Sequence, residues 1–156
     1  MTTPIRARDI MVTNLITVRE DMDLHDVARL LVKNKISGAP VVDPNGGLLG
    51  VLTEKDLMTA LIDAAYDDLP STKVGAYMQR NPQSIDEDLD VLSIAQIFQT
   101  RTYRRLPVVK DGQLVGQISR RDVLRAVIKL LEPAQDHSTA LLYLSALRDL
   151  NDAPFD

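Results

Sequence analysis

The sequence contains no cysteine and no tryptophan, and it has only two phenylalanines and four tyrosines. A chain without cysteine forms no disulfides and no thiolate metal sites, which is typical of a protein in a reducing compartment. We therefore expect a cytoplasmic protein. Because aromatic residues make up only 4% of the chain, the core must consist of valine, isoleucine, leucine, alanine and methionine.

Long apolar runs are also missing. None approaches the ~18–20 residues that a membrane helix needs, and the N-terminus lacks the pattern of a signal peptide. We expect no membrane partner. The net charge of −4, with a pI near 5.1, argues against a general nucleic-acid binder, which usually carries a basic excess. A length of 156 residues indicates one ordinary domain or two small ones packed together.

The motifs of common enzymes are absent as well. The chain has no P-loop, no G-x-G-x-x-G, no G-x-S-x-G and no metalloprotease His-Glu pair. The two histidines, His25 and His137, have no second ligand at metal-binding spacing, so we predict no metal site. A third hypothesis, an enzyme of small phosphorylated metabolites, lacks any recognisable set of catalytic residues in this sequence. The sequence therefore predicts that the protein is not an enzyme and has no catalytic cofactor.

The sequence does contain an internal repeat. The segment Gly-Val-Leu-Thr-Glu-Lys-Asp at 50–56 returns as Gly-Gln-Ile-Ser-Arg-Arg-Asp at 116–122. Met11 returns as Met78, and Pro-Val-Val at 40–42 returns at 107–109. Two units are too few for a solenoid but suit a pseudo-twofold pair that buries one face of each unit against the other.

The residue pattern of each unit predicts the element order β-α-β-β-α, which is an α/β (α+β) fold. A lead-in segment (7–11 and 74–78) precedes a short extended piece (15–18 and 83–85). Aspartates then begin a helix whose apolar residues recur at helical spacing. Strands at 39–42 and 48–52, and at 106–109 and 114–118, are joined by turns rich in Asp, Asn and Gly. Closing helices are expected at 54–62 and 120–131.

These patterns predict the domain boundaries. The first repeat should span 7–62, a linker 63–73 and the second repeat 74–131. Pro70 stops the preceding helix. Residues 133–156 lie outside the repeat, and we expect a C-terminal helical extension there, with an apolar stripe between 139 and 150.

Each repeat resembles a cystathionine-β-synthase-type (CBS) domain, and together they look like a CBS pair, or Bateman module. The resemblance covers about 7–131 and rests on the paired methionines, the acidic helix starts, the Ala-Pro-Val-Val and Leu-Pro-Val-Val segments and the repeated Gly-h-h-Thr/Ser-x-x-Asp ending. Gln117 departs from it, at an apolar position of that ending. The family fold implies tandem units about a pseudo-twofold axis, further dimerisation, and adenosine ligands in the cleft between the units.

The repeated ending allows two interpretations. Thr53 with Asp56, and Ser119 with Asp122, can form capping boxes that stabilise the helix starts by about 1 kcal/mol without any ligand. The same helix N-termini are natural anion sites. The resemblance implies that Asp56 and Asp122 bind ribose hydroxyls and that Thr53 and Ser119 contact phosphate. Capping and binding are compatible.

The resemblance also implies where adenine is bound, although each of these residues can equally belong to the core or an ordinary surface. The base would lie between the strand after the first helix and the early extended piece. The matching positions are Thr17, Ile36, Gly38, Ala39 and Pro40 in one repeat, and Ser84, Tyr103, Leu106 and Pro107 in the other.

The two repeats differ most in basic residues. Arg104 and Arg105 replace Ser37 and Gly38, and guanidinium groups suit phosphate. Arg120 and Arg121 stand at the second closing helix, where Glu54 and Lys55 stand in the first. Lys55 and Arg121 are therefore candidate phosphate contacts as well. Alternatively, these arginines pair with surface carboxylates. The two clefts should differ, and one can be empty.

From these residues we predict a regulatory module that binds an adenine nucleotide, AMP, ADP or ATP rather than S-adenosylmethionine, between its repeats. Binding would shift its conformation or its oligomeric state, most simply as a homodimer, and an unidentified partner protein would respond. The alternative is an interaction scaffold that dimerises and binds no ligand.

Overall fold

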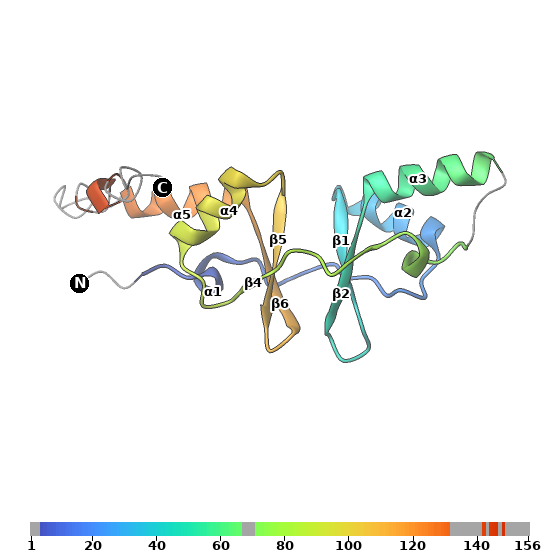
Figure 1. The fold of residues 1–156 in the computed structure, drawn as a ribbon, viewed down its shortest axis with the longest axis horizontal. Coiled ribbons are helices and arrows are strands. Elements are labelled where there is room, and N and C mark those ends of the chain that lie inside the picture. The colour runs from blue at the N-terminus through green and yellow to red at the C-terminus, as the bar shows by residue number, and fades with distance from the viewer. Residues whose placement is uncertain (1–3, 67–70, 132–141, 143, 147, 149–156) are drawn as a thin grey trace, which may run out of the picture.

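The structure is a computed structural model that describes residues 4–66, 71–131, 142, 144–146 and 148. Most of the predicted C-terminal extension therefore lies outside the described residues, although 142, 144–146 and 148 are helical. The remainder forms two similar halves. In each half one small sheet lies near the centre of the molecule and two long helices lie toward the outside (Figure 1).

The elements of each half follow the predicted order. The first half contains α2 (Leu24–Asn34), β1 (Gly38–Val42), β2 (Leu48–Thr53) and α3 (Glu54–Ala65). The second half contains α4 (Val91–Thr100), β5 (Arg105–Lys110), β6 (Gln113–Ser119) and α5 (Arg120–Leu131). In both, the two strands form an antiparallel hairpin. The mixed α and β fold with two related units is confirmed.

Four shorter elements precede the first long helix of one half or the other. They are α1 (Ala7–Ile10), the 3-10 helix η1 (Val74–Ala76), β3 (Gln79–Arg80) and β4 (Ile85–Asp86). β3 pairs antiparallel with β2, and β4 pairs parallel with β5. The sequence predicted extended pieces at 15–18 and 83–85. The second becomes β4, shifted along the chain, whereas in the first only Val18 pairs, in a single bridge to Val41.

The first long helix of each half begins at an aspartate. The Asp23 side chain accepts a hydrogen bond from the His25 amide, and that of Asp90 accepts one from Ser93. Because these bonds satisfy backbone donors that the helix leaves unpaired, the aspartates stabilise both helix starts. The Ser93 bonds also lower the pKa of Asp90. Each helix then buries one apolar face, for example through Val27 in α2 and Ile94 in α4, both 0% exposed.

The two hairpin tips are joined to each other. The Leu48 amide donates to the Gly112 carbonyl at 3.2 Å, and the Leu114 amide donates to the Gly46 carbonyl at 3.1 Å. Asp111 and Gly112 have φ angles of 50° and 78°, as a two-residue hairpin turn requires. These bonds fix one sheet against the other at the pseudo-twofold axis.

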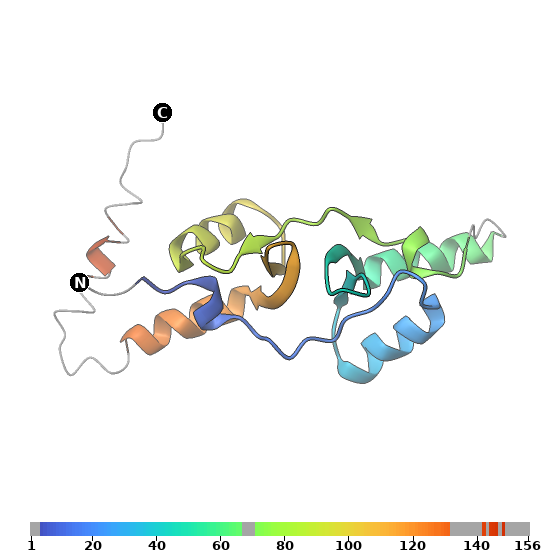
Figure 2. The ribbon, with the colours of Figure 1, turned by 90° about the horizontal axis from the view of Figure 1, so that it is seen from below.

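The lead-in segments are exchanged between the halves. Ala7 is fully buried in the core of the second half, and its amide donates to the Leu89 carbonyl at 2.8 Å. Val74 is fully buried in the core of the first half, and its amide donates to the Met22 carbonyl at 3.0 Å. Figure 2 shows the two segments that follow crossing between the halves in opposite directions. Each core is therefore completed by the segment that precedes the other repeat.

This exchange explains two of the repeated residues. A Cβ atom at Gly116 would lie 2.5 Å from the Met11 sulfur, and one at Gly50 would lie 2.5 Å from the Gln79 carbonyl oxygen and 3.3 Å from the Met78 sulfur. A side chain at either glycine would collide with the crossing segment, with its backbone at Gly50 and with the Met11 side chain at Gly116. The Gly50–Met78 and Gly116–Met11 pairs are the contacts through which the crossing segments pack.

Helix α3 continues further than predicted. It ends at Ala65 rather than Ile62, so 63–65, assigned to the linker, are helical. Pro70 restricts only its immediate neighbour, and nothing earlier forces the helix to stop. In this last turn Asp63 accepts a hydrogen bond from the Tyr77 hydroxyl at 2.6 Å. Burial, this hydrogen bond and the negative charge of Asp63 raise the pKa of Tyr77 to about 12.

Candidate functional site

The start of helix α5 is closed by Ser119 and Asp122. The Ser119 amide donates to Asp122 Oδ2 at 2.8 Å, and the Asp122 amide donates to Ser119 Oγ at 3.2 Å. This reciprocal pair is a capping box. The Asp122 side chain is only 11% exposed, and its Oδ1 lies 3.4 Å from Arg125 on the next turn. The helix thus begins with a partly buried carboxylate held in a fixed orientation.

The start of helix α3 has the same arrangement. The Thr53 amide donates to Asp56 Oδ2 at 2.8 Å, the Thr53 hydroxyl donates to the same oxygen at 2.9 Å, and the Asp56 amide donates to Thr53 Oγ1 at 3.3 Å. The capping interpretation therefore holds for both helices. It leaves the ligand hypothesis open, because a capped helix start still presents its carboxylate and its dipole.

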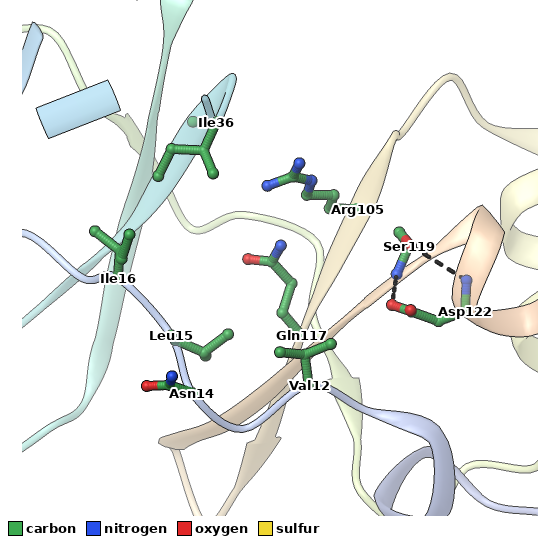
Figure 3. Close-up of a pocket in the computed structure, with 10 residues that line it drawn as sticks. Val12, Asn14, Leu15, Ile16, Ile36, Arg105, Gln117, Ser119 and Asp122 are labelled. Atoms are coloured by element: carbon green, nitrogen blue, oxygen red, sulfur yellow. Dashed lines mark hydrogen bonds between the residues drawn. The ribbon is translucent and has the colours of Figure 1, made fainter. Parts of the chain in front are cut away.

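A cleft of about 270 Å³ extends from the start of α5 to the first half (Figure 3). Ser119 and Asp122 lie on one wall, and Ile16 and Ile36 lie on the opposite wall. The Arg105 and Gln117 side chains project into the space between them. The cleft is lined by Val12, Asn14, Leu15, Ile16, Ile36, Gly38, Arg105, Gln117, Ser119 and Asp122. It is therefore built by both repeats.

Five of the residues that the sequence singled out line this cleft. They are Ile36, Gly38, Arg105, Ser119 and Asp122. The others do not line it. Ala39 and Leu106 are buried in the two cores, and Tyr103 packs against the second core. The candidates that remain outside the lining are Thr17, Ala39, Pro40, Thr53, Lys55, Asp56, Ser84, Tyr103, Arg104, Leu106, Pro107 and Arg121.

Strand geometry separates candidates that are neighbours in sequence. Successive side chains of a strand point to opposite faces of the sheet. Gly38 and Arg105 therefore line the cleft, while the next residues, Ala39 and Leu106, are turned into the cores, where they are 1% and 0% exposed. The predicted set of ligand-binding residues included both members of each pair, because the prediction did not take this alternation into account.

The sequence reasoning missed half of the cleft. Val12, Asn14, Leu15 and Ile16 belong to the crossing segment between α1 and α2, and Gln117 belongs to β6. Val12 pairs with Gln117 through reciprocal backbone hydrogen bonds of 2.9 and 3.0 Å, which carries the crossing segment into the cleft. Asn14, which returns as Asn81, and the polar Gln117 at an otherwise apolar position were the available signals.

Four arginines near the start of α5 and β5 take part in none of the ion pairs among the described residues. Within the described part of the chain the salt bridges join Arg6 and Arg8 to Asp88, Arg80 to Glu20, Lys110 to Glu87 and Arg125 to Asp122. None of them includes the arginines at 104, 105, 120 or 121. Arg120 instead donates to the Tyr103 carbonyl at 3.3 Å. The start of α5 is thus basic on its exposed side.

In residues 4–66 and 71–131, no group of three or more His, Asp or Glu side chains could hold a metal ion. Across the helices that the structure describes, none combines the length and apolar character needed to cross a bilayer.

The CBS domain model matches residues 7–63 and again residues 74–129. The chain belongs to the CBS domain family. Its two halves are therefore a CBS pair, and the cleft lies between the two CBS domains. A CBS domain-containing protein of Dictyostelium discoideum is 31% identical over 144 residues, which cover 86% of this chain and 99% of that protein.

Solved CBS pairs share the fold. CBSX2 from Arabidopsis thaliana, in complex with AMP, matches with a TM-score of 0.73 and 30% identity, over 80% of this chain and 97% of that one. The CBS pair of protein MJ0100, in complex with 5′-methylthioadenosine and S-adenosylmethionine, matches with a TM-score of 0.67 and 26% identity, over 81% and 98% of the two chains.

Proposed function

We propose that this CBS pair is a regulatory module that binds an adenine nucleotide in the cleft between its repeats. The observation that carries the proposal is the cleft itself, in which the capped start of α5 faces an apolar wall from the first repeat. The adenosine ligands in CBSX2 and in MJ0100 support it. The module regulates another protein, acts in the cytoplasm and carries out no catalytic step.

Each part of the nucleotide has a matching group in the cleft. The carboxylate of Asp122 accepts hydrogen bonds from the ribose hydroxyls, as acidic residues do in dinucleotide folds. Ile16, Ile36 and Gly38 form the apolar surface for the base. The phosphate lies near Ser119 at the helix N-terminus, where the dipole and the basic side chains favour an anion.

AMP fits this cleft better than ATP. A volume of about 270 Å³ lies just below the ~300–1,000 Å³ typical of small-molecule pockets. Arg105 is the one cationic side chain among the residues that line it, which suits a single phosphate better than three. ADP and ATP would place their further phosphates outside, beside Arg120 and Arg121. S-adenosylmethionine, a cation, is disfavoured by the same basic side.

Isothermal titration calorimetry tests the proposal. AMP should bind the wild-type protein, and Asp122→Asn should weaken binding by about 10- to 100-fold, because a hydrogen bond to a charged group is worth ~1.5–3 kcal/mol. Asp26→Asn, an exposed position on α2, is the matched control and should bind like wild type. The absence of heat with millimolar AMP, ADP, ATP and S-adenosylmethionine would refute nucleotide binding.

We propose that the module works as a homodimer. Met58 on α3 and its counterpart Leu124 on α5 are 55% and 62% exposed, and the next such pair, Ile62 and Ile128, is 58% and 51% exposed. Exposed apolar side chains at the same helix positions of both repeats favour a second copy of the chain as the partner. A nucleotide that binds two dimer arrangements with different affinities would shift their populations.

The same apolar positions favour the second candidate function, a dimerising scaffold without a ligand. Sedimentation velocity of the wild type and of Met58→Glu with Leu124→Glu measures the dimer. A dimer that the double variant dissociates, in a protein that binds no adenosine ligand, would favour the scaffold. A wild-type monomer would refute dimerisation in both proposals.

A further inference from the structure

The repeat has a second position equivalent to the cleft, at the start of α3. We propose that the hydrogen bond from the Gln79 side chain to the Asp56 carboxylate makes this the weaker of two nucleotide sites. This inference rests on the proposed function, because it concerns how the two related sites divide the binding of one ligand.

Backbone pairing establishes which residues correspond. Val12 bridges to Gln117 on the hairpin that leads into the α5 start, and Gln79 pairs with Val51 on the hairpin that leads into the α3 start. Val12 and Gln79 therefore hold the same position on the two crossing segments. The polar and apolar residues are interchanged: glutamine lies on the crossing segment in one site and on the hairpin strand in the other.

This interchange of glutamine and valine changes which side chain contacts the aspartate. The Gln79 amide nitrogen lies 3.2 Å from Asp56 Oδ1 and 3.5 Å from Oδ2. Because the Thr53 amide and hydroxyl already bond to Oδ2, Gln79 takes the oxygen that the capping box leaves free. A ribose diol must displace this side chain before it can bond to Asp56.

Among the described residues, the Asp122 carboxylate accepts no side-chain hydrogen bond from across its cleft. Val12 has no side-chain donor. The bond that Asp122 Oδ1 does accept comes from Arg125 on the same helix, and Arg125 does not line the cleft. Asp122 itself lines the cleft, so a ligand that enters between the repeats can reach its carboxylate without displacing a side chain of the crossing segment.

Reciprocal substitutions test the inference by calorimetry with AMP. Gln79→Val should tighten the weaker site by about tenfold, since the competing bond to a charged group is lost. Val12→Gln should weaken the tighter site by a similar factor.

Three further variants serve as controls. Adding Asp56→Asn to Gln79→Val should abolish the gain in affinity, which assigns that gain to the site at the start of α3. Gln79→Ser, too short to reach Asp56, should reproduce Gln79→Val, and Gln96→Val on the exposed face of α4 should change nothing.

The outcomes separate the inference from the proposed function. If the wild type binds AMP and neither reciprocal substitution changes an affinity, Gln79 is not the determinant, while nucleotide binding stands. The same conclusion follows if Gln96→Val matches the effect of Gln79→Val. If no protein in the set binds AMP, the proposed function fails and the inference fails with it.

Discussion

The starts of α3 and α5 have the same types of capping residue but different surroundings. Both have a hydroxyl and an aspartate three residues apart, and both close into a capping box with 2.8 Å bonds between the first amide and the carboxylate. They differ in what lies across from the carboxylate, glutamine in one and valine in the other. The shared part stabilises the helix, whereas the part that differs decides whether a ligand can reach the aspartate.

The largest effect is expected where the crossing segments pass the hairpins. Gly50→Ala would bring a Cβ 2.5 Å from the Gln79 carbonyl, a backbone atom, whereas Gly116→Ala would meet the flexible Met11 side chain. We expect losses of unfolding free energy of about 3 and about 1 kcal/mol, at the two ends of the range for overpacking. Urea unfolding measures both. Equal losses would show that the two crossings are equally rigid.

Removing the hydroxyls separates capping from binding. Thr53→Ala and Ser119→Ala should each cost about 1 kcal/mol of stability, as expected for an N-cap residue. Ser119→Ala should also weaken AMP binding at the tighter site by several-fold, because Ser119 lines the cleft, whereas Thr53→Ala should leave the affinity of that site unchanged. Thermal unfolding and calorimetry on the same samples test this. A matching affinity loss in Thr53→Ala would mean that the two helix starts are functionally equal.

The first helix of the second half should lose part of its stability in acid through Asp90. Because hydrogen bonds from Ser93 lower the pKa of Asp90 below its ordinary value near 3.8, the folded state favours the charged carboxylate. Its contribution is fully present above that ordinary value and is lost as the pH falls through the lowered pKa. Asp90→Ala should therefore cost about 1 kcal/mol at pH 7 and almost nothing below the lowered pKa.

Urea unfolding of Asp90→Ala and wild type at pH 7, 4 and 2.5 measures that difference. Asp23→Ala, at the matching helix start of the first half, is the comparison variant. An Asp90→Ala deficit that stays constant with pH would contradict the role of its charge.

The smallest effect concerns the bond between α3 and the segment after η1. With its pKa raised to about 12, the neutral Tyr77 hydroxyl contributes to stability up to about pH 10, and this contribution is lost as the pH rises toward 12. Spectrophotometric titration should show a late ionisation step that Tyr77→Phe removes. Tyr66→Phe, at an exposed position, should leave the late step in place.

The sequence predicted the parts of this molecule that depend on local patterns. The aspartate caps of α2 and α4 and the hydroxyl–carboxylate pairs of α3 and α5 were all identified, because each joins residues within one helical turn. The repeat itself indicated the fold and the family. Asp122 and Arg105 were among the candidates, and both line the cleft.

The contacts that the sequence did not predict join residues far apart in the chain. The bond from Gln79 to Asp56 spans 23 positions and depends on β3 adding to the hairpin, which two residues of strand do not reveal by periodicity. The place of Val12 in the cleft depends on the exchange of the lead-in segments. No local pattern shows that a segment packs on the half that it does not precede.

That exchange makes the two halves dependent on each other for folding. Cleaving the chain between the repeats would leave each piece with a lead-in segment that has no core to fill and a core that lacks its last apolar side chains. Two copies of one piece could satisfy both needs by swapping their segments around a true twofold axis. The present chain has the arrangement of such a swapped dimer within one polypeptide, in which each side can vary independently, as Gln79 and Val12 do.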